Sequence, residues 1–261
     1  MSGMSATSSR ASAVGSRASA VGSQASAAGH GKRRRLFTVS HETFESMFWL
    51  VYTGLMVNVA LVLANVPLAF FVFAVPDPLA SWPFFLLLSL TIAPSVAGAF
   101  GCFRAMKDDG PPRPLLAFWR SYRRNVLRAF VVGLVAGAIV AIVLLDLAVL
   151  ASNPLTPGLL ISLVAPTFFM LGVSALAVTI VALAGFALYP QASAWAVVKA
   201  SVFLAIKRWY FSVMAIVLVG LIAAAVLLQP ILGAFLAPSV LLFAVWSNAH
   251  FSFVKLLEVA R

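Results

Sequence analysis

The chain has 261 residues, of which 62% are hydrophobic and only 10% are Asp, Glu, Lys or Arg, and its mean hydropathy is +1.05. A water-soluble globular domain carries about 25% charged residues, so the composition excludes that class. Long charge-free stretches need a lipid bilayer rather than a larger protein core. The sequence therefore predicts a polytopic membrane protein.

The net charge of +11 comes from 18 Lys and Arg residues against 7 Asp and Glu residues. The basic residues lie between apolar runs, which indicates anionic lipid headgroups as partners and argues against nucleic acid. The single cysteine, Cys102, excludes an intrachain disulfide and any CxxC redox or zinc pair.

The N-terminal segment is a near-repeat of seven residues, at 10–16, 17–23 and 24–30. Small and polar residues of this kind bury too little apolar area to offset backbone entropy, so we predict a disordered, basic, low-complexity tail over residues 1–40. The basic cluster at 32–35 precedes a span too long for a signal peptide, and therefore indicates a cytoplasmic N-terminus rather than export.

Residues 41–261 are expected to form an all-α transmembrane bundle of six helices. Charge-free stretches cover 46–76, 78–103, 129–145, 147–198 and 209–254. About 20 residues cross a bilayer, so each of the last two stretches must contain a turn, and 152–158 and 229–230 have the composition of turns. The predicted helices lie near 47–74, 83–105, 126–150, 159–188, 209–228 and 231–253.

Six crossings place both termini and the loops 104–128 and 189–208 on one side of the membrane. All 18 Lys and Arg residues then lie on that side, and the positive-inside rule assigns it to the cytoplasm. We therefore expect a multi-pass protein of the cell membrane with cytoplasmic N- and C-termini. The connections on the other side are too short for a folded domain.

Motifs for catalysis are missing from the sequence. It contains no GxxxxGK[ST] phosphate loop, no HExxH and no GxSxG. His30, His41 and His250 lie far apart and have no Cys or carboxylate at ligand spacing, which argues against a metal site. We expect no catalytic residues, no metal, no cofactor and no enzymatic activity.

Four polar residues in the apolar runs are candidate functional residues: Asn58, Asn65, Thr91 and Asp146. Asn58 and Asn65 are seven residues apart, so both amides lie near one helix face, which should point into the bundle. They are explained either by hydrogen bonds between helices or by a substrate or ion path that includes Thr91. Asp146 is expected near the outer surface, as an interfacial or helix-pairing carboxylate or as a coupling site for protons or ions.

Two further patterns concern helix packing. Gly133 and Gly137 form a GxxxG ridge, which favours close packing within the bundle, with a dimer as the alternative. Prolines interrupt several apolar runs; such breaks form binding sites in some transporters but are also ordinary in transmembrane helices.

The segment 113–125 combines aromatic and basic residues. At helical spacing one stripe is apolar (Leu115, Trp119, Tyr122, Val126) and another is basic (Arg113, Arg120, Arg124, Arg128). This pattern predicts an interfacial helix that leads into the third crossing and faces lipid phosphate or a partner protein. The candidate docking residues are Trp119, Arg120, Arg123 and Arg124. The loop 189–208 shows the same pattern more weakly.

Three stretches of this sequence resemble the YesL family of bacterial integral membrane proteins. They are 58–67 (NVALVLANVP), 91–94 (TIAP) with the small residues that follow, and 118–125 (FWRSYRRN). Ala93 stands where the family has glycine. The resemblance covers roughly residues 40–260, and implies six helices, a bacterial origin and an association with carbohydrate ABC uptake by gene context, without catalytic residues.

These observations lead to one hypothesis and one alternative. The first is a non-enzymatic accessory or interaction component of the cell membrane, whose partners are anionic lipids and subunits of a carbohydrate ABC transporter. The segment 189–208 lacks the coupling loop of a permease subunit, so the chain is not expected to be that subunit. The alternative is a stand-alone transporter for small solutes or ions, with Asn58, Asn65 and Asp146 on its path.

Overall fold

The structure, a computed structural model, describes residues 41–77, 80–108, 113–152 and 157–259, so the predicted tail lies outside the described residues. Contacts divide the chain into Met1–Ser46 and Met47–Arg261. The described residues form helices throughout: α2 (His41–Ala64), α3 (Val66–Ala74), α4 (Trp82–Ser89), α5 (Ile92–Asp108), α6 (Pro114–Ser152), α7 (Gly158–Leu188), α8 (Ala194–Lys207), α9 (Trp209–Leu228) and α10 (Pro230–Val259).

Six helical segments are long and apolar enough to cross a membrane. They are Met47–Ala64, Trp82–Asp108, Pro114–Ser152, Ile161–Leu188, Trp209–Leu228 and Gly233–Leu256. This confirms the predicted all-α fold with six candidate membrane spans. The cytoplasmic placement of the two termini stays a prediction.

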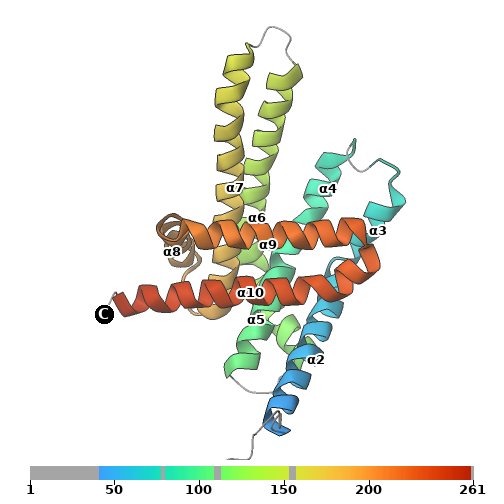
Figure 1. Ribbon diagram of the computed structural model, residues 1–261, viewed down its shortest axis with the longest axis vertical. Coiled ribbons are helices and arrows are strands. Elements are labelled where there is room, and N and C mark those ends of the chain that lie inside the picture. Colours follow the sequence, from blue (N-terminus) through green and yellow to red (C-terminus); the bar gives the residue numbers. More distant parts are fainter. Residues whose placement is uncertain (1–40, 78–79, 109–112, 153–156, 260–261) are drawn as a thin grey trace, which may run out of the picture. The chain divides into compact units, whose positions relative to one another are not determined.

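Within Met47–Arg261 the helices pack as neighbouring pairs. Helices α3 and α4, α6 and α7, and α9 and α10 are in contact, and Figure 1 shows the α9–α10 pair running across α5, α6 and α7 rather than parallel to them. The core lies where α5, α6 and α7 meet, and its largest fully buried side chains are Phe100, Phe118 and Phe186.

The first two predicted crossings are each interrupted, which corrects the expectation of one helix per crossing. Helix α2 ends at Ala64 before α3 begins at Val66, and α4 ends at Ser89 before α5 begins at Ile92. Pro67 is the second residue of α3 and Pro94 the third residue of α5. Proline has no N–H to continue the preceding hydrogen bonds but is tolerated in a first turn, so each break falls just before a proline.

The third crossing also differs from its prediction, because α6 runs from Pro114 to Ser152 without a break and includes the expected interfacial helix. The apolar stripe of this segment stays outside the bundle, since Leu115, Trp119 and Val126 are exposed, whereas Phe118 and Asn125 are buried. Two glycines of α5 determine which face of α6 packs against it.

A Cβ atom at Gly98 would lie 3.1 Å from the ring of Phe118, and one at Gly101 would collide with the side chain of Ser121. The two glycines thus leave space on α5 into which Phe118 and Ser121 of α6 pack. Ser121 Oγ donates a hydrogen bond to the carbonyl oxygen of Ala97 (3.0 Å), which anchors the two helices.

The GxxxG ridge of α6 packs within the chain. A Cβ atom at Gly133 would lie 2.8 Å from the Cβ of Ala93, and one at Gly137 would lie 3.5 Å from Leu90 Cδ2. The glycines therefore let α6 approach the segment where α4 passes into α5. Packing within the bundle was one of the two interpretations of this motif.

We predict that Gly133→Leu destabilises the protein, because the added side chain has no space beside Ala93. Overpacking of this kind costs about 1–3 kcal/mol. The measurement is thermal unfolding of the purified protein in detergent. Gly220→Leu on α9 is the matched control, since a Cβ atom there meets nothing within 4 Å; equal changes in Tm for the two variants would contradict the packing argument.

Candidate functional site

The two helix interruptions meet at the side chain of Asn65. Its Oδ1 accepts a hydrogen bond from Thr91 Oγ1 (2.9 Å), and its Nδ2 donates to Ser95 Oγ (2.8 Å) and to the carbonyl oxygen of Leu61 (2.8 Å). Asn65 lies between α2 and α3, and Thr91 lies between α4 and α5. We call Asn65, Thr91 and Ser95 the polar junction.

The polar junction also bonds to the backbone around both breaks. Thr91 Oγ1 lies 2.8 Å from the carbonyl oxygen of Leu88, and Ser95 Oγ lies 2.8 Å from that of Ile92. In hydrocarbon there is no water to satisfy the carbonyls that a broken helix frees, and each unsatisfied group is costly. The carbonyls of Leu61 and Leu88 also accept hydrogen bonds from the backbone N–H groups of Asn65 and Thr91, so the side chains of the polar junction add a second bond at each break.

Asn58 forms a separate set of hydrogen bonds with α10. Its Nδ2 donates to the carbonyl oxygen of Phe235 (2.6 Å) and to Ser239 Oγ (3.0 Å), and its Oδ1 accepts from the backbone N–H of Ser239 (2.7 Å). In a regular helix the N–H of residue 239 bonds to the carbonyl of residue 235. The Asn58 amide bridges this pair beside Pro238, where the helix ladder is weakened.

The structure thus places the four intramembrane candidates in three locations. Asn65 and Thr91 share the polar junction, Asn58 binds α10, and Asp146 lies exposed on α6 near its end at Ser152. Both asparagines form hydrogen bonds between helices. The predicted substrate path through Asn58, Asn65 and Thr91 stays a prediction.

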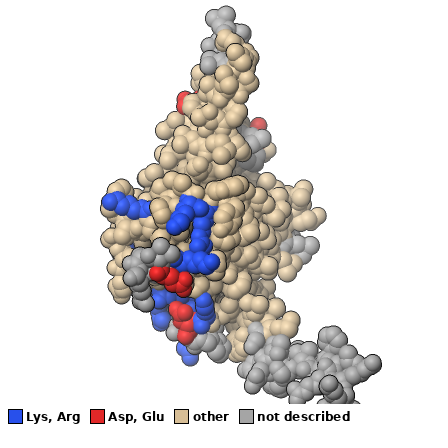
Figure 2. Space-filling view, turned by 60° about the vertical axis from the view of Figure 1, so that its left-hand side comes forward, with Lys and Arg blue, Asp and Glu red and all other residues tan. Residues whose placement is uncertain are grey.

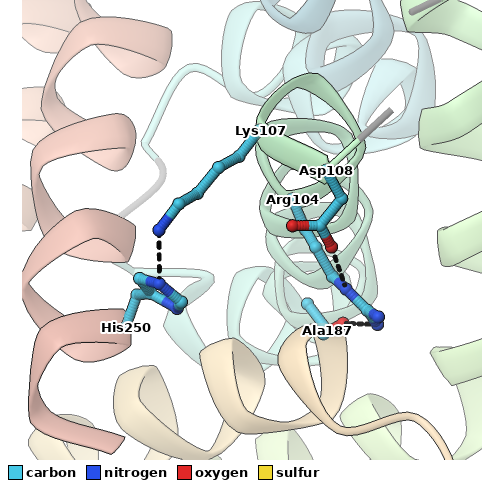
Figure 3. A network of polar contacts seen from close by, with 5 residues as sticks. All are labelled: Arg104, Lys107, Asp108, Ala187 and His250. Carbon is cyan, nitrogen blue, oxygen red and sulfur yellow. Dashed lines mark hydrogen bonds and ion pairs between the residues drawn. The ribbon is translucent and has the colours of Figure 1, made fainter. Parts of the chain in front are cut away.

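Arginines from α5 and α6 bind the C-terminal end of α7. Arg104 Nη1 donates to the carbonyl oxygen of Ala187 (3.0 Å), and its Nε bonds to Asp108 Oδ2 (3.1 Å) in the same network (Figure 3). Arg128 Nη1 donates to the carbonyl of Ala192 (3.1 Å), just after α7. The last carbonyls of a helix lack partners within the helix and carry partial negative charge, so guanidinium groups are suited to this position.

Several lysines contact aromatic rings or a histidine of α10. Lys107 Nζ lies 2.6 Å from His250 Nε2, as Figure 3 shows. Lys199 lies 5.1 Å from the ring of Trp195, and Lys255 lies 4.6 Å from that of Phe251. Figure 2 shows the Lys and Arg side chains gathered over one part of the surface. On the face shown, the basic side chains lie near one another rather than as isolated charges.

The four predicted docking residues are exposed but separate into two groups. Arg120 and Arg124 line a cavity of about 240 Å³ between α5, α6 and the end of α7, together with Arg104, Ser121 and Asn125. Trp119 and Arg123 are not in its lining. Sequence reasoning missed Arg104 and Asn125 as members of this group, although Asn125 ends the aromatic and basic stretch in the sequence.

Residues 46–147 match the family described as "Protein of unknown function, DUF624". The chain is similar to this family over less than half of its length. No curated protein and no solved structure matches the chain. The matched region covers most of α2 and α6 and everything between them, so it contains the polar junction, the glycine ridge and the α6 side of the cavity.

All three stretches of the YesL resemblance lie inside the matched region. Asn65, Thr91 and Ser121, which belong to these stretches, form hydrogen bonds that join helices of the matched region. The comparison supports a membrane family of unknown function and assigns no activity to any residue.

We predict that Thr91→Val lowers stability, because the substitution keeps the side-chain shape and removes the hydrogen bond to Asn65. Hydrogen bonds between membrane helices contribute about 0.6 kcal/mol on average and about 1.7 kcal/mol at most. Thr179→Val is the matched control, since the Thr179 hydroxyl bonds within its own helix to Ala175. A reversible unfolding titration in mixed micelles measures both; a loss no greater than that of the control would show that the junction is not a stabilising contact.

Proposed function

We propose that the chain is a non-enzymatic accessory component of the cell membrane that binds a partner protein through the first turns of α6. The observation that carries this proposal is the exposed Trp119. Its ring contacts Phe118 and Tyr122, with centroids 5.6 and 5.2 Å apart, so these contacts hold the side chain in place although it is 36% exposed. Ordered Trp and Arg side chains contribute most to protein interfaces.

Arg123 is the second residue of the proposed docking surface. It is exposed, has no ion-pair partner among the described residues and lies four residues along the same helix from Trp119. We define Trp119 and Arg123 as the α6 docking surface. Its exposed arginine favours a partner that presents an acidic surface.

In this proposal the partner is a subunit of a carbohydrate ABC transporter, and the protein is a bacterial YesL-like protein with both termini in the cytoplasm. The support for the partner is the resemblance of the three motif stretches to the YesL family. The support for the orientation is the distribution of Lys and Arg between the apolar runs.

The test is crosslinking in native membranes followed by affinity purification and mass spectrometry of the co-purified proteins. We expect the double variant Trp119→Ala with Arg123→Ala to recover at least about tenfold less partner, since each interface anchor commonly contributes more than 1 kcal/mol. The matched control is Trp195→Ala with Lys199→Ala, which removes an exposed tryptophan and a cation from α8.

Equal recovery by the wild type and the α6 variant would remove α6 as the docking surface. Loss of recovery in the α8 variant alone would move the docking surface to α8. Recovery of this chain alone in every sample would reject the accessory function.

A stand-alone transporter is the second candidate function, and one observation favours it. A cavity of about 370 Å³ between α2, α5 and α10 is lined by Thr53, Asn58 and Ser239 among apolar residues, and Thr53 Oγ1 has no hydrogen-bond partner among the described residues. Polar groups of this kind beside a proline-interrupted helix are found at transport sites.

For this candidate, we predict flux of a small sugar, ion or proton into liposomes that contain the purified protein, and slower flux for Asn58→Leu. Empty liposomes and the Thr179→Val protein are the controls. Absence of flux above empty liposomes for all three solutes would reject the transporter function.

A further inference from the structure

We infer that the cavity between α5, α6 and the end of α7 binds a phosphate ester that also carries a hydroxyl group. We call this cavity the arginine pocket. Its charged and polar lining residues are Arg104, Asp108, Arg120, Ser121, Arg124 and Asn125. This inference does not depend on partner docking at Trp119 and Arg123, because neither residue lines the pocket.

The first argument is an excess of positive charge. Three guanidinium groups line the pocket against one carboxylate, Asp108, which is already bonded to Arg104. Arg120 and Arg124 have no ion-pair partner among the residues that the structure describes. Like charges four residues apart on a helix repel each other, so the pair is stabilised by an anion between or beside them. Planar guanidinium forks match the oxygens of a phosphate group.

The second argument concerns a buried acceptor in the same pocket. Asn125 is 2% exposed, and its Oδ1 is buried without a hydrogen-bond partner in the described part of the chain. Its Nδ2 donates to the carbonyl oxygen of Ser121 (3.1 Å), which fixes the orientation of the amide. A buried acceptor without a donor costs about 1–3 kcal/mol, and no described residue supplies a donor to Oδ1, which favours a donor from a bound ligand.

The other lining groups do not supply that donor. The hydroxyl of Ser121 donates to the carbonyl of Ala97, and Arg104 donates to Asp108 and Ala187. A ligand that satisfies the whole pocket therefore provides negative charge for Arg120 and Arg124 and a hydrogen-bond donor, such as a hydroxyl group, for Asn125. A glycerol phosphate group provides both.

The size and position of the pocket fit this chemistry. Its volume of about 240 Å³ is just below the ~300–1,000 Å³ of clefts that hold drug-sized ligands, so it accommodates a headgroup-sized molecule. It lies at the C-terminal ends of the spans Trp82–Asp108 and Ile161–Leu188 and in the first turns of α6. Burial raises the pKa of the Tyr189 phenol, against the opposing charge of Arg104, so this neighbour remains neutral and does not compete as an anion.

The test uses the full-length protein in phosphatidylcholine nanodiscs, with native mass spectrometry of added lipids. Phosphatidylglycerol carries a phosphate diester with hydroxyl groups, and phosphatidylmethanol carries the same charge without a hydroxyl. We expect wild-type protein to bind phosphatidylglycerol about tenfold more tightly than phosphatidylmethanol, the effect of one hydrogen bond to a buried group. The glycerol phosphate group can also come from a soluble molecule rather than a lipid. Calorimetry with soluble glycerol 1-phosphate tests binding of that form.

Three variants separate the contributions of the pocket. The double variant Arg120→Ala with Arg124→Ala should bind both anionic lipids at least about tenfold more weakly than the wild type, because two charge-assisted contacts are lost. Asn125→Leu should abolish the preference for phosphatidylglycerol and retain binding of both lipids, which also shows that the variant is folded. Lys255→Ala on α10 is the control, with a positive charge removed outside the pocket, and should bind both lipids like the wild type.

Equal lipid binding by the wild type and the double arginine variant would overturn the inference, since general attraction of anionic lipids to a basic surface would then explain the binding. Equal affinity of the wild type for the two anionic lipids would also overturn it, because the buried Asn125 would have no part in binding. Arginine-dependent binding of glycerol 1-phosphate without binding of phosphatidylglycerol would uphold the chemistry and assign the site to a soluble ester.

Discussion

The structure depends on one constraint: inside a membrane, the chain itself must satisfy every backbone group that a broken helix releases. Prolines break the first two spans, and the Asn65 amide joins the breaks by bonding to Thr91, Ser95 and the carbonyl of Leu61. The Asn58 amide links α2 to α10, where it donates to the carbonyl of Phe235 and accepts from the N–H of Ser239, on either side of Pro238. The polar residues of these spans therefore act first as hydrogen-bonded links between helix segments, and an additional functional role requires groups that these bonds leave unsatisfied.

The glycines make these junctions possible by letting whole helices approach. Gly133 brings α6 against Ala93 at the start of α5, and Gly98 and Gly101 admit Phe118 and Ser121. A membrane offers no hydrophobic driving force between helices, so close packing and hydrogen bonds have to hold α5 and α6 together. Because α5 and α6 are fixed to each other, Arg104 on one helix and Arg120 and Arg124 on the other converge on one pocket. The polar end of the protein is thus positioned by contacts among small residues along the spans.

The sequence predicted the number and approximate bounds of the spans, because charge-free length and turn residues determine where a chain can cross a bilayer. It failed at Pro67 and Pro94, where the spans were predicted as continuous helices, because a count of apolar residues carries no information on hydrogen-bond continuity. It did not identify the inward face at the start of α6. The apolar stripe at Leu115 and Trp119 was the stronger pattern on the helix itself, whereas the true face is set by glycines on the neighbouring α5. Asn125 and Arg104 could not be grouped in advance, since their proximity arises only after these two helices pack.

The basic residues at this end of the protein differ in what their charges bind. Arg104 and Arg128 donate to carbonyls at and beyond the end of α7, where short hydrogen bonds fix their positions. Lys199, Arg208 and Lys255 lie against aromatic rings. Arg120 and Arg124 have neither kind of partner among the described residues, although they share a pocket with the buried, unpaired Oδ1 of Asn125. An electrostatic surface needed only to orient the chain in the membrane would require no buried acceptor. The combination of unpaired donors and an unpaired acceptor in one cavity is therefore better explained by a ligand with both a phosphate and a hydroxyl group than by membrane orientation alone.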